Sequence, residues 1–401
     1  MANTSLQIGN SNWAIKEDNL LGYSTEGKIL LPQPITMTRA SAGTRVNSSG
    51  FVETVELLGS DLVVNGDFLS DIDGWSNNLV GSVPDIAWND GKARITNTTG
   101  SSYNTGLNTT NDPFNGLTGV VKVTGNIQII SGSAGTWTVR EHYGTTTSFV
   151  LDASGNFEVI LSLNGTSDNL ALYAYASNLV FDIDNIVAKE VTKNNLARVD
   201  YDGTVSSLLV EPERTNLIQY SDDFSNAAWV TLGTITVTPN DGTSPLGGMS
   251  ADKVLGLDSI SAISLIVSGT IGTEYTSSVY IKNVDSIMSS LLIRNTTTVV
   301  SCGLNWSGNI LTSVTNNTGV TTFTDEGGGW YRLKSTYIAI ESPQRTRYYP
   351  TKTSISSSIM LWGAQLEAGS YATSYIPTDG DTVTRLQDQY EKTGISDLIN
   401  S

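Results

Sequence analysis

Several aromatic side chains of this sequence have the chemistry needed to bind sugars. An indole or phenol ring stacks on the apolar C–H face of a pyranose, while neighbouring Asn, Asp and Gln side chains bond its hydroxyl groups. Trp137 and Tyr143 flank His142 in GTWTVREHYG, between two strand-like runs, which suggests a polar pocket there. Each such ring is also a normal core residue, and the sequence leaves both interpretations open. The candidate ligand-binding residues are Trp137, Tyr143, Trp88 and Trp306, followed by Tyr173, Tyr175, Tyr348 and Tyr349.

Residues suited to catalysis are scarce. With one cysteine, Cys302, and one histidine, His142, the chain has no internal disulfide and lacks the ligands of a Cys/His zinc site. Cys302 lies in the apolar run TTTVVSCGLNW and is predicted to be a core thiol. Glu211 and Glu213 have a spacing that a glycosidase pair could use, but we favour a structural turn in which Arg214 pairs with one of them. Without a nucleophile-elbow or phosphate-loop motif, we expect no enzyme activity.

Composition limits the partners of the chain. It has 401 residues and a formal net charge of −17, from 22 Lys plus Arg against 39 Asp plus Glu. Phosphate backbones need clustered cations, and none are visible, so we expect neither nucleic acid nor an anionic membrane as partner. No apolar run is long enough for a membrane-spanning helix, and the N-terminal residues show no secretory signal. An acidic surface serves solubility, or repulsion between neighbouring copies on a crowded particle.

The spacing of apolar residues predicts an all-β protein. Runs such as VVKVTGNIQII, NFEVILSLNG and WYRLKSTYIAI alternate apolar and polar positions, which places one side of each strand in a core. Two tandem β-sandwich domains of the jelly-roll type are expected. Both predicted modules begin with Asp-Phe shortly before a Trp, at Asp67 to Trp75 and Asp223 to Trp229, which indicates weak internal repetition. The expected parts are an N-terminal attachment strap at 1–60, a first module at 61–191, a linker strand at 192–207, a second module at 208–385 and a tail at 386–401. The strap could instead pair with strands of a later domain.

Four sequence blocks carry a resemblance to a known family. They are ITMTRASAGTRVNSSGFVETV (35–55), NLARVDYDG (195–203), LLVEPERTNLIQYSDDFSNAAW (208–229) and IMLWGAQLEAGSYATSYIPTDGDTVTR (359–385). The chain resembles virion appendage proteins of tailed bacteriophages, of the head-fibre and tail-fibre type, which carry β-sandwich modules like those of carbohydrate-binding modules. Because Trp75, Trp229, Trp330 and Trp362 lie within family-like motifs, the resemblance implies that they are core residues.

The same resemblance implies a structural calcium site in the first module. Its oxygen ligands would be Asn65, Asp67, Asp182 and Asp184, from the first and last strands. Leu69 stands where a glutamate ligand is expected after NGDF, which argues against the site. The alternative is that these acids cap turns.

Together, the residues and the resemblance predict a virion structural protein assembled in the host cytoplasm. It would contact other capsid or tail proteins, form a homo-oligomer for which a trimer is favoured, and bind cell-surface glycans weakly through many copies. One alternative is a purely structural head-fibre or decoration protein without a ligand. The other is a polysaccharide depolymerase, which needs only two carboxylates.

Overall fold

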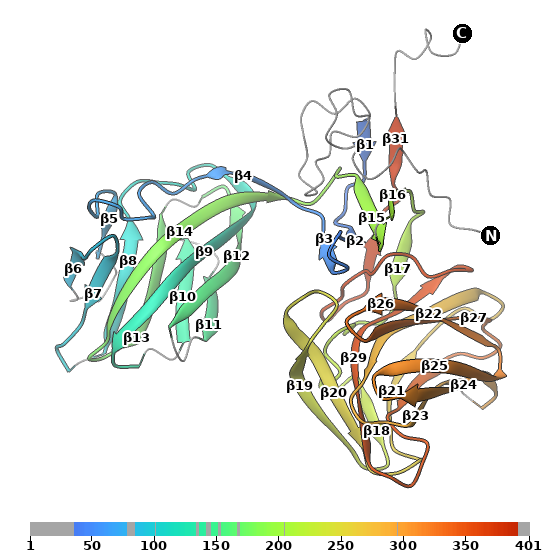
Figure 1. Cartoon of the computed structure of the whole chain (residues 1–401). Coiled ribbons are helices and arrows are strands. Elements are labelled where there is room, and N and C mark those ends of the chain that lie inside the picture. The colour runs from blue at the N-terminus through green and yellow to red at the C-terminus, as the bar shows by residue number, and fades with distance from the viewer. Residues whose placement is uncertain are drawn as a thin grey trace, which may run out of the picture. The chain divides into compact units, whose positions relative to one another are not determined.

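The architecture is all β, as predicted. The structure is a computed structural model, and it describes residues 36–77, 85–100, 102–133, 136–141, 146–150, 154–166, 169–203, 205–294 and 296–391. Within these ranges the chain forms strands, turns and bends, and no helix (Figure 1). Accordingly, no part of the described chain is a helix of the length and apolarity needed to cross a bilayer. Residues 1–35 of the predicted strap and 392–401 of the predicted tail lie outside the described residues.

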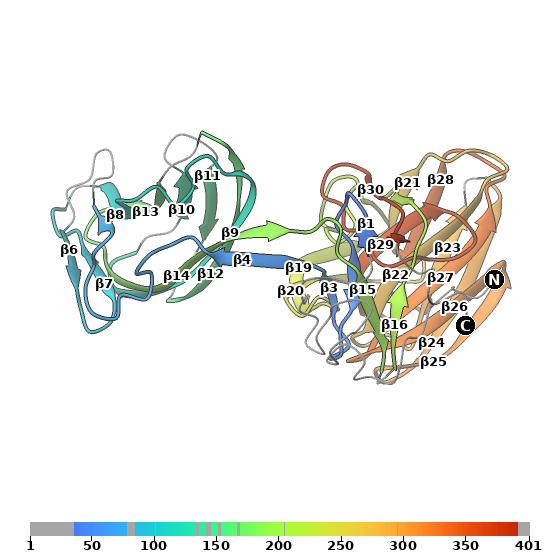
Figure 2. The same ribbon diagram turned by 90° about the horizontal axis from the view of Figure 1, so that it is seen from above.

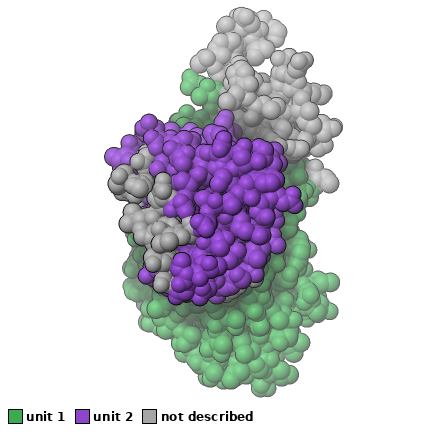
Figure 3. Space-filling model, turned by 90° about the vertical axis from the view of Figure 1, so that its left-hand side faces the viewer, with its two compact units in different colours: residues 1–55, 193–401 green, residues 56–192 purple. Residues whose placement is uncertain are grey.

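The chain folds into two compact units. Unit 1 comprises residues 1–55 and 193–401, and unit 2 comprises residues 56–192 (Figure 3). The first module expected at 61–191 compares with unit 2, while the strap, linker strand and second module expected from the sequence all contribute to unit 1. Residues 36–55 of the predicted strap pair and pack with segments of unit 1, which is the alternative that the sequence left open, whereas residues 56–60 belong to unit 2.

Unit 2 is a sandwich of two antiparallel sheets. One contains, in spatial order, β11 (Thr146–Val150), β10 (Thr136–Glu141), β13 (Leu170–Ala176), β8 (Tyr103–Thr109) and β5 (Trp75–Ser76). The other contains β12 (Gly155–Asn164), β9 (Thr118–Ser131), β14 (Val180–Thr192), β7 (Ala93–Thr96) and β6 (Asp85–Trp88), with β4 (Leu57–Asp61) also paired to β14.

Alternation along the strands builds the core of unit 2. In β12, Phe157, Val159, Leu161 and Leu163 are buried and the residues between them are exposed. Their inward side chains meet those of the opposite sheet, including Trp137 of β10. Burial of each large apolar side chain stabilises the fold by about 1.5–3 kcal/mol, so the period-two pattern holds the two sheets face to face.

Unit 1 contains a second sandwich, whose two sheets form separate layers in Figure 1 and are seen from above in Figure 2. The first sheet runs β18 (Val230–Leu232), β21 (Ala262–Val267), β28 (Gln344–Tyr349), β23 (Met288–Arg294), β24 (Thr298–Ser307) and β25 (Ile310–Thr318). The second runs β19 (Ile235–Thr243), β20 (Met249–Gly256), β29 (Ser357–Ala368), β22 (Glu274–Asn283), β27 (Trp330–Ile338) and β26 (Val320–Gly327). Cys302 packs in the core between them, as predicted.

Four two-stranded ribbons complete unit 1. They are β1 (Thr36–Thr38) with β31 (Gln389–Glu391), β2 (Thr44–Val46) with β3 (Val52–Thr54), β15 (Arg198–Asp202) with β16 (Val205–Leu209), and β17 (Arg214–Asn216) with β30 (Val383–Arg385). Val52 of β3 packs against Tyr280, Trp330 and Trp362 of the second sheet. The ribbon β2–β3 therefore covers aromatic side chains that would otherwise face solvent, and Trp330 and Trp362 are buried core residues, as predicted.

The internal repetition has a structural counterpart. Phe68 contacts Trp75 with ring centroids 5.5 Å apart, and Phe224 contacts Trp229 at 4.6 Å. In each pair the indole Nε1 donates a hydrogen bond to a backbone carbonyl that precedes the Asp-Phe step, that of Asn65 in unit 2 and that of Tyr220 in unit 1. Both tryptophans are buried, as the resemblance implied.

Candidate functional site

The four family-like sequence blocks meet in a buried cluster of charged side chains in unit 1. Its members are Arg39, Arg198, Glu211, Arg385 and Asp388, which we call the ion-pair cluster, and all five are buried. Arg39 and Arg198 lie 349 and 190 residues from Asp388 in the sequence. The ribbons bring them together, because β1 pairs with β31 next to Asp388 and β17 pairs with β30, which ends at Arg385.

Each carboxylate of the cluster contacts two guanidinium groups. Asp388 binds Arg39 with 2.6 Å between Nη1 and Oδ1, and its other oxygen binds Nη2 of Arg198. Glu211 Oε2 lies 2.9 Å from Nη2 of Arg198 and 2.9 Å from Nη1 of Arg385. Ser374 adds its backbone N–H and hydroxyl as donors to Glu211, at 2.8 and 2.7 Å.

The electrostatics of Glu211 follow from these contacts. Burial alone would raise the pKa of this carboxyl, but Arg385 and Arg198, together with the donors of Ser374, lower the pKa to about 2. Glu211 therefore stays ionised at all ordinary pH values and is unsuited to donate a proton. Removing one partner from such a buried pair costs about 3–5 kcal/mol, because it leaves a charge without compensation. The cluster thus holds four segments that are distant in the sequence in a fixed arrangement.

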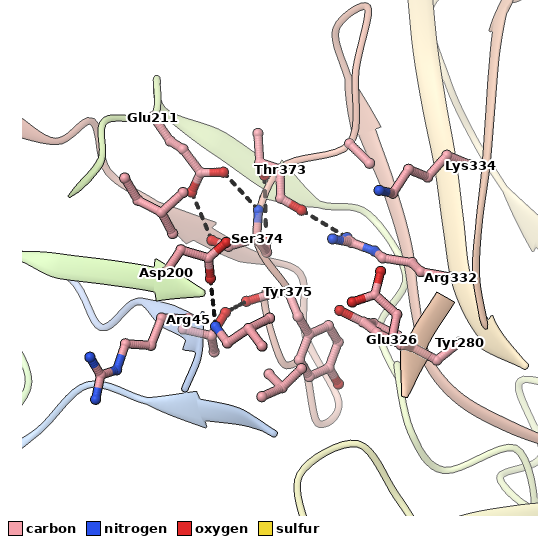
Figure 4. Close-up of a pocket in the computed structure, with 15 residues that line it drawn as sticks. Arg45, Asp200, Glu211, Tyr280, Glu326, Arg332, Lys334, Thr373, Ser374 and Tyr375 are labelled. Carbon is pink, nitrogen blue, oxygen red and sulfur yellow. Dashed lines mark hydrogen bonds between the residues drawn. The ribbon is translucent and has the colours of Figure 1, made fainter. Parts of the chain in front are cut away.

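A polar cavity of about 140 Å³ lies beside the ion-pair cluster (Figure 4). Arg332 and Lys334 of β27 contribute to its wall, and in Figure 4 their charged ends point in the same direction, toward the segment that carries Thr373. Asp200 of β15 lies on the other side of the cavity, and Glu326 of β26 also lines it. Ser374 and Glu211 line both the cavity and the cluster.

The cavity holds charged groups that lack direct ion pairs among the described residues. Arg332 is buried, donates from Nη2 to the Ser278 hydroxyl at 3.0 Å and the Thr373 carbonyl at 2.7 Å, and leaves its Nε without a hydrogen-bond partner. Burial raises the pKa of Asp200 to about 6, although its Oδ1 accepts a hydrogen bond from Val46 N at 2.6 Å. Burial also lowers the pKa of Lys334.

The blocks that build this site are recognisable in the sequence, but the geometry of the site is not. Arg332 and Lys334 stand in WYRLK, where their spacing of two places both on one side of a strand. That spacing was a usable signal, since two cations on the same side of a half-buried strand need an explanation. Glu213, proposed as a possible partner of Glu211, is exposed, and Arg214 donates to the Glu213 backbone carbonyl while Glu211 pairs with other arginines.

The structure removes two of the four primary aromatic candidates. Trp137 is fully buried against Phe181, with ring centroids 4.8 Å apart, and therefore has no face for a sugar. Trp306 is buried too, and its Nε1 donates to the Ser289 hydroxyl at 2.8 Å. Trp88 on β6 is 45% exposed, with its Nε1 bonded to the Phe68 carbonyl. Tyr143 and His142 lie outside the described residues. Of the described candidates, Trp88 and Trp137 belong to different sheets of unit 2, and Trp306 belongs to unit 1.

Of the secondary candidates, the tyrosines of β13 form an exposed aromatic surface. Tyr173 and Tyr175 alternate with buried alanines and so lie on the outer face of the five-stranded sheet of unit 2, and Tyr175 is 70% exposed. Arg140 of the neighbouring strand β10 lies over the Tyr173 ring, 5.2 Å from its centroid. Tyr348 and Tyr349, by contrast, are buried in unit 1. We call Tyr173, Tyr175 and Arg140 the tyrosine face.

A glycine shapes the tyrosine face. Gly106 of β8 is the register partner of Tyr173, and a Cβ at this position would lie 2.1 Å from the Leu172 carbonyl oxygen and 2.5 Å from the Tyr173 backbone. Only glycine therefore allows this close approach of the two strands. The absence of a side chain at Gly106 also leaves one flank of Tyr173 uncovered.

Three of the four proposed calcium ligands have other partners, and the fourth, Asp67, is exposed. Asp182 is buried and forms a bidentate ion pair with Arg94, with distances of 2.7 and 2.8 Å. The Asp184 carboxylate accepts hydrogen bonds from Asn185, and the Asn65 side chain bonds Asp71 and the Asp73 carbonyl. Among the described residues, no three His, Cys, Asp or Glu side chains form a group that fits a metal ion. The guanidinium of Arg94 neutralises the acid that the ion would require, so these residues do not fit a calcium site.

Comparisons with known proteins add little to this description. No protein-family model and no curated protein matches the chain. Among solved structures, it is similar to the tandem CBM22-1–CBM22-2 domain of Paenibacillus barcinonensis Xyn10C, with 14% identity, a TM-score of 0.28, and coverage of 77% of this chain and 97% of that one. It is also similar to a Paenibacillus xanthan lyase, with 14% identity, a TM-score of 0.21, and coverage of 76% and 25%. Both TM-scores are below 0.5.

Proposed function

We propose that this chain is a structural appendage protein of a tailed-phage virion that binds glycans through the tyrosine face of unit 2. The observation that carries the binding proposal is Tyr175, a large ring that is 70% exposed on a regular strand. Its neighbours supply the polar groups that sugar hydroxyls need, with Asn104 opposite Tyr175 in the register and Arg140 beside Tyr173. An aromatic surface flanked by hydrogen-bonding groups is the usual composition of a carbohydrate site.

The virion assignment rests on the sequence resemblance. Three arginines and a glutamate from the family-like blocks, Arg39, Arg198, Arg385 and Glu211, build the ion-pair cluster, so the shared residues have a structural task. The net charge of −17 fits a protein displayed in many copies that must repel one another away from their attachment point. In this proposal the protein contacts capsid or tail proteins, forms a homotrimer and has no enzyme activity.

A glycan array tests the binding proposal. Display of many copies on a bead compensates for weak single sites. We expect Tyr175→Ala to weaken binding by about fivefold to tenfold per site, the range set by loss of one aromatic stacking contact. Tyr175→Phe keeps the stacking ring and should retain most of the binding. Asn156→Ala, an exposed change on the other sheet, is the matched control and should have no effect.

The results distinguish three functions: a glycan-binding virion protein, a purely structural virion protein and a polysaccharide depolymerase. Absence of glycan binding by the displayed wild type, in a protein that is still ordered on purified particles, would favour the purely structural alternative. Release of reducing ends from host polysaccharide would favour the depolymerase. The virion assignment is tested by a density map of the intact particle that locates the chain and counts its copies. Recovery of the chain only from particle-free fractions would refute that assignment.

A further inference from the structure

We propose that the cavity beside the ion-pair cluster is a second binding site, which takes a small ligand with one carboxylate and several hydroxyl groups, of the hexuronic acid class. This site lies in unit 1 and does not depend on the tyrosine face of unit 2. It also differs in chemistry, since it would bind by charge and hydrogen bonds rather than by stacking.

The cations of β27 provide the anion-binding half of the site. Arg332 and Lys334 lie two residues apart on the strand and line the same cavity. Neither forms an ion pair with a carboxylate of the described chain. Lys334 has one long hydrogen bond, 3.2 Å to the Thr324 hydroxyl, and Arg332 Nε is a buried donor without a partner. The Lys334 ammonium has three N–H donors and only one hydrogen bond within the described chain, so it can donate a charge-assisted hydrogen bond to a carboxylate in the cavity.

The opposite half of the cavity is suited to hydroxyl groups. Asp200 lines it with carboxylate oxygens, which accept hydrogen bonds from hydroxyl donors, and Glu326 contributes a further carboxylate beside Arg332 (Figure 4). A ligand with an acidic group alone would offer no hydroxyl donor to Asp200, and a neutral sugar would form no ion pair with Lys334. A molecule with a carboxylate at one end and hydroxyl groups at the other satisfies both halves.

The volume and the charge of the cavity further limit the class of ligand that it can bind. A cavity of about 140 Å³ holds several water molecules at about 30 Å³ each, which is room for a single sugar residue. Glu211 also lines the cavity, but its charge is compensated by Arg198 and Arg385. Arg332 and Lys334 share the cavity with Asp200 and Glu326, so one further negative charge is easier to accept than the two of inorganic sulfate or of a phosphate monoester dianion.

The test is a ligand-detected NMR titration of the full chain with sodium glucuronate, with glucose and sodium sulfate as reference compounds. A ligand of about 13 non-hydrogen atoms is expected to bind in the millimolar range. Lys334→Gln should weaken glucuronate binding about tenfold, because it removes one charge-assisted hydrogen bond while the side-chain stem remains. Lys189→Gln in unit 2 is the matched control and should bind as the wild type does. Arg332 is left unchanged because it also holds the Thr373 carbonyl.

Three results would overturn the proposal. They are the absence of glucuronate binding by the folded wild type, equal affinity for glucuronate and sulfate, and an unchanged affinity of a folded Lys334→Gln variant. Circular dichroism and the melting temperature establish that each variant is folded. Tyr175→Ala should leave glucuronate binding unchanged, and Lys334→Gln should leave binding through the tyrosine face unchanged. Failure at one site is therefore distinguishable from failure at the other.

Discussion

Glu211 offers the sharpest test of the electrostatics of unit 1. Replacing it with Gln removes the charge that compensates Arg198 and Arg385 but keeps the side-chain shape. The lowering of the Glu211 pKa from 4.5 to about 2 corresponds to about 3 kcal/mol, at about 1.4 kcal/mol per pKa unit. We therefore expect Glu211→Gln to lower the free energy of unfolding of unit 1 by about 3 kcal/mol at pH 7.

The pH dependence of this loss has a defined sign. The folded-state pKa lies below the unfolded value, so the stabilisation is fully present above pH 4.5 and is lost as the pH falls toward 2. At pH 3 the wild type should already have lost about 2 kcal/mol of it, because the unfolded chain binds the proton and the folded chain does not. The difference between wild type and variant should therefore shrink to about 1 kcal/mol at pH 3.

Urea denaturation at both pH values measures these differences, and hydrogen exchange of peptides from β16 and β29 assigns them to unit 1. Glu213→Gln is the matched control, since Glu213 lies two residues away but is exposed, and its effect should stay within about 0.5 kcal/mol. A loss below about 1 kcal/mol at pH 7, or an equal loss at both pH values, would refute the assignment of Glu211 as the centre of a buried ion-pair cluster.

Further predictions concern the other features. Trp137→Ala should destabilise unit 2 by about 3–5 kcal/mol in urea denaturation, because it empties a fully buried site. Gly106→Ala should lower the melting temperature of unit 2, since the new Cβ meets the backbone of the paired strand; an unchanged melting temperature would contradict the strand register. A calcium chelator should leave the melting temperature of unit 2 unchanged, because Asp182 is already paired with Arg94. Asp222→Asn should stabilise unit 1 at pH 7.5 and have little effect at pH 3, because burial and nearby acids raise the pKa of Asp222 to about 6. The destabilisation by its charge begins above the unfolded-state pKa of 3.8 and is complete above about pH 6.

Local patterns were enough to predict the strands and the fold class. Period-two alternation in segments such as β12 and β27 is a local property, and it directs one side of each strand toward a core whatever the partner strand is. The same holds for Cys302, whose apolar surroundings in the sequence predicted its burial.

The roles of single aromatic and acidic residues could not be predicted in this way. Trp137 and Tyr175 both lie in alternating strands, but one points into the core and the other into solvent. The inward side of a strand can be predicted only when its apolar residues are confined to one side. In GTWTVREHYG, apolar and polar residues occur on both sides. Asp182 looked like a calcium ligand because its partner, Arg94, is 88 residues away in the sequence.

The sequence by itself determined that this chain is an acidic all-β protein whose alternating strands form two sandwiches, because these properties depend on composition and on neighbours along the chain. Only the tertiary structure decided that Arg39, Arg198, Glu211, Arg385 and Asp388 share one buried cluster beside a polar cavity. The physical reason is that ion pairs depend on distance in space, and residues up to 349 positions apart become neighbours only when the ribbons pair.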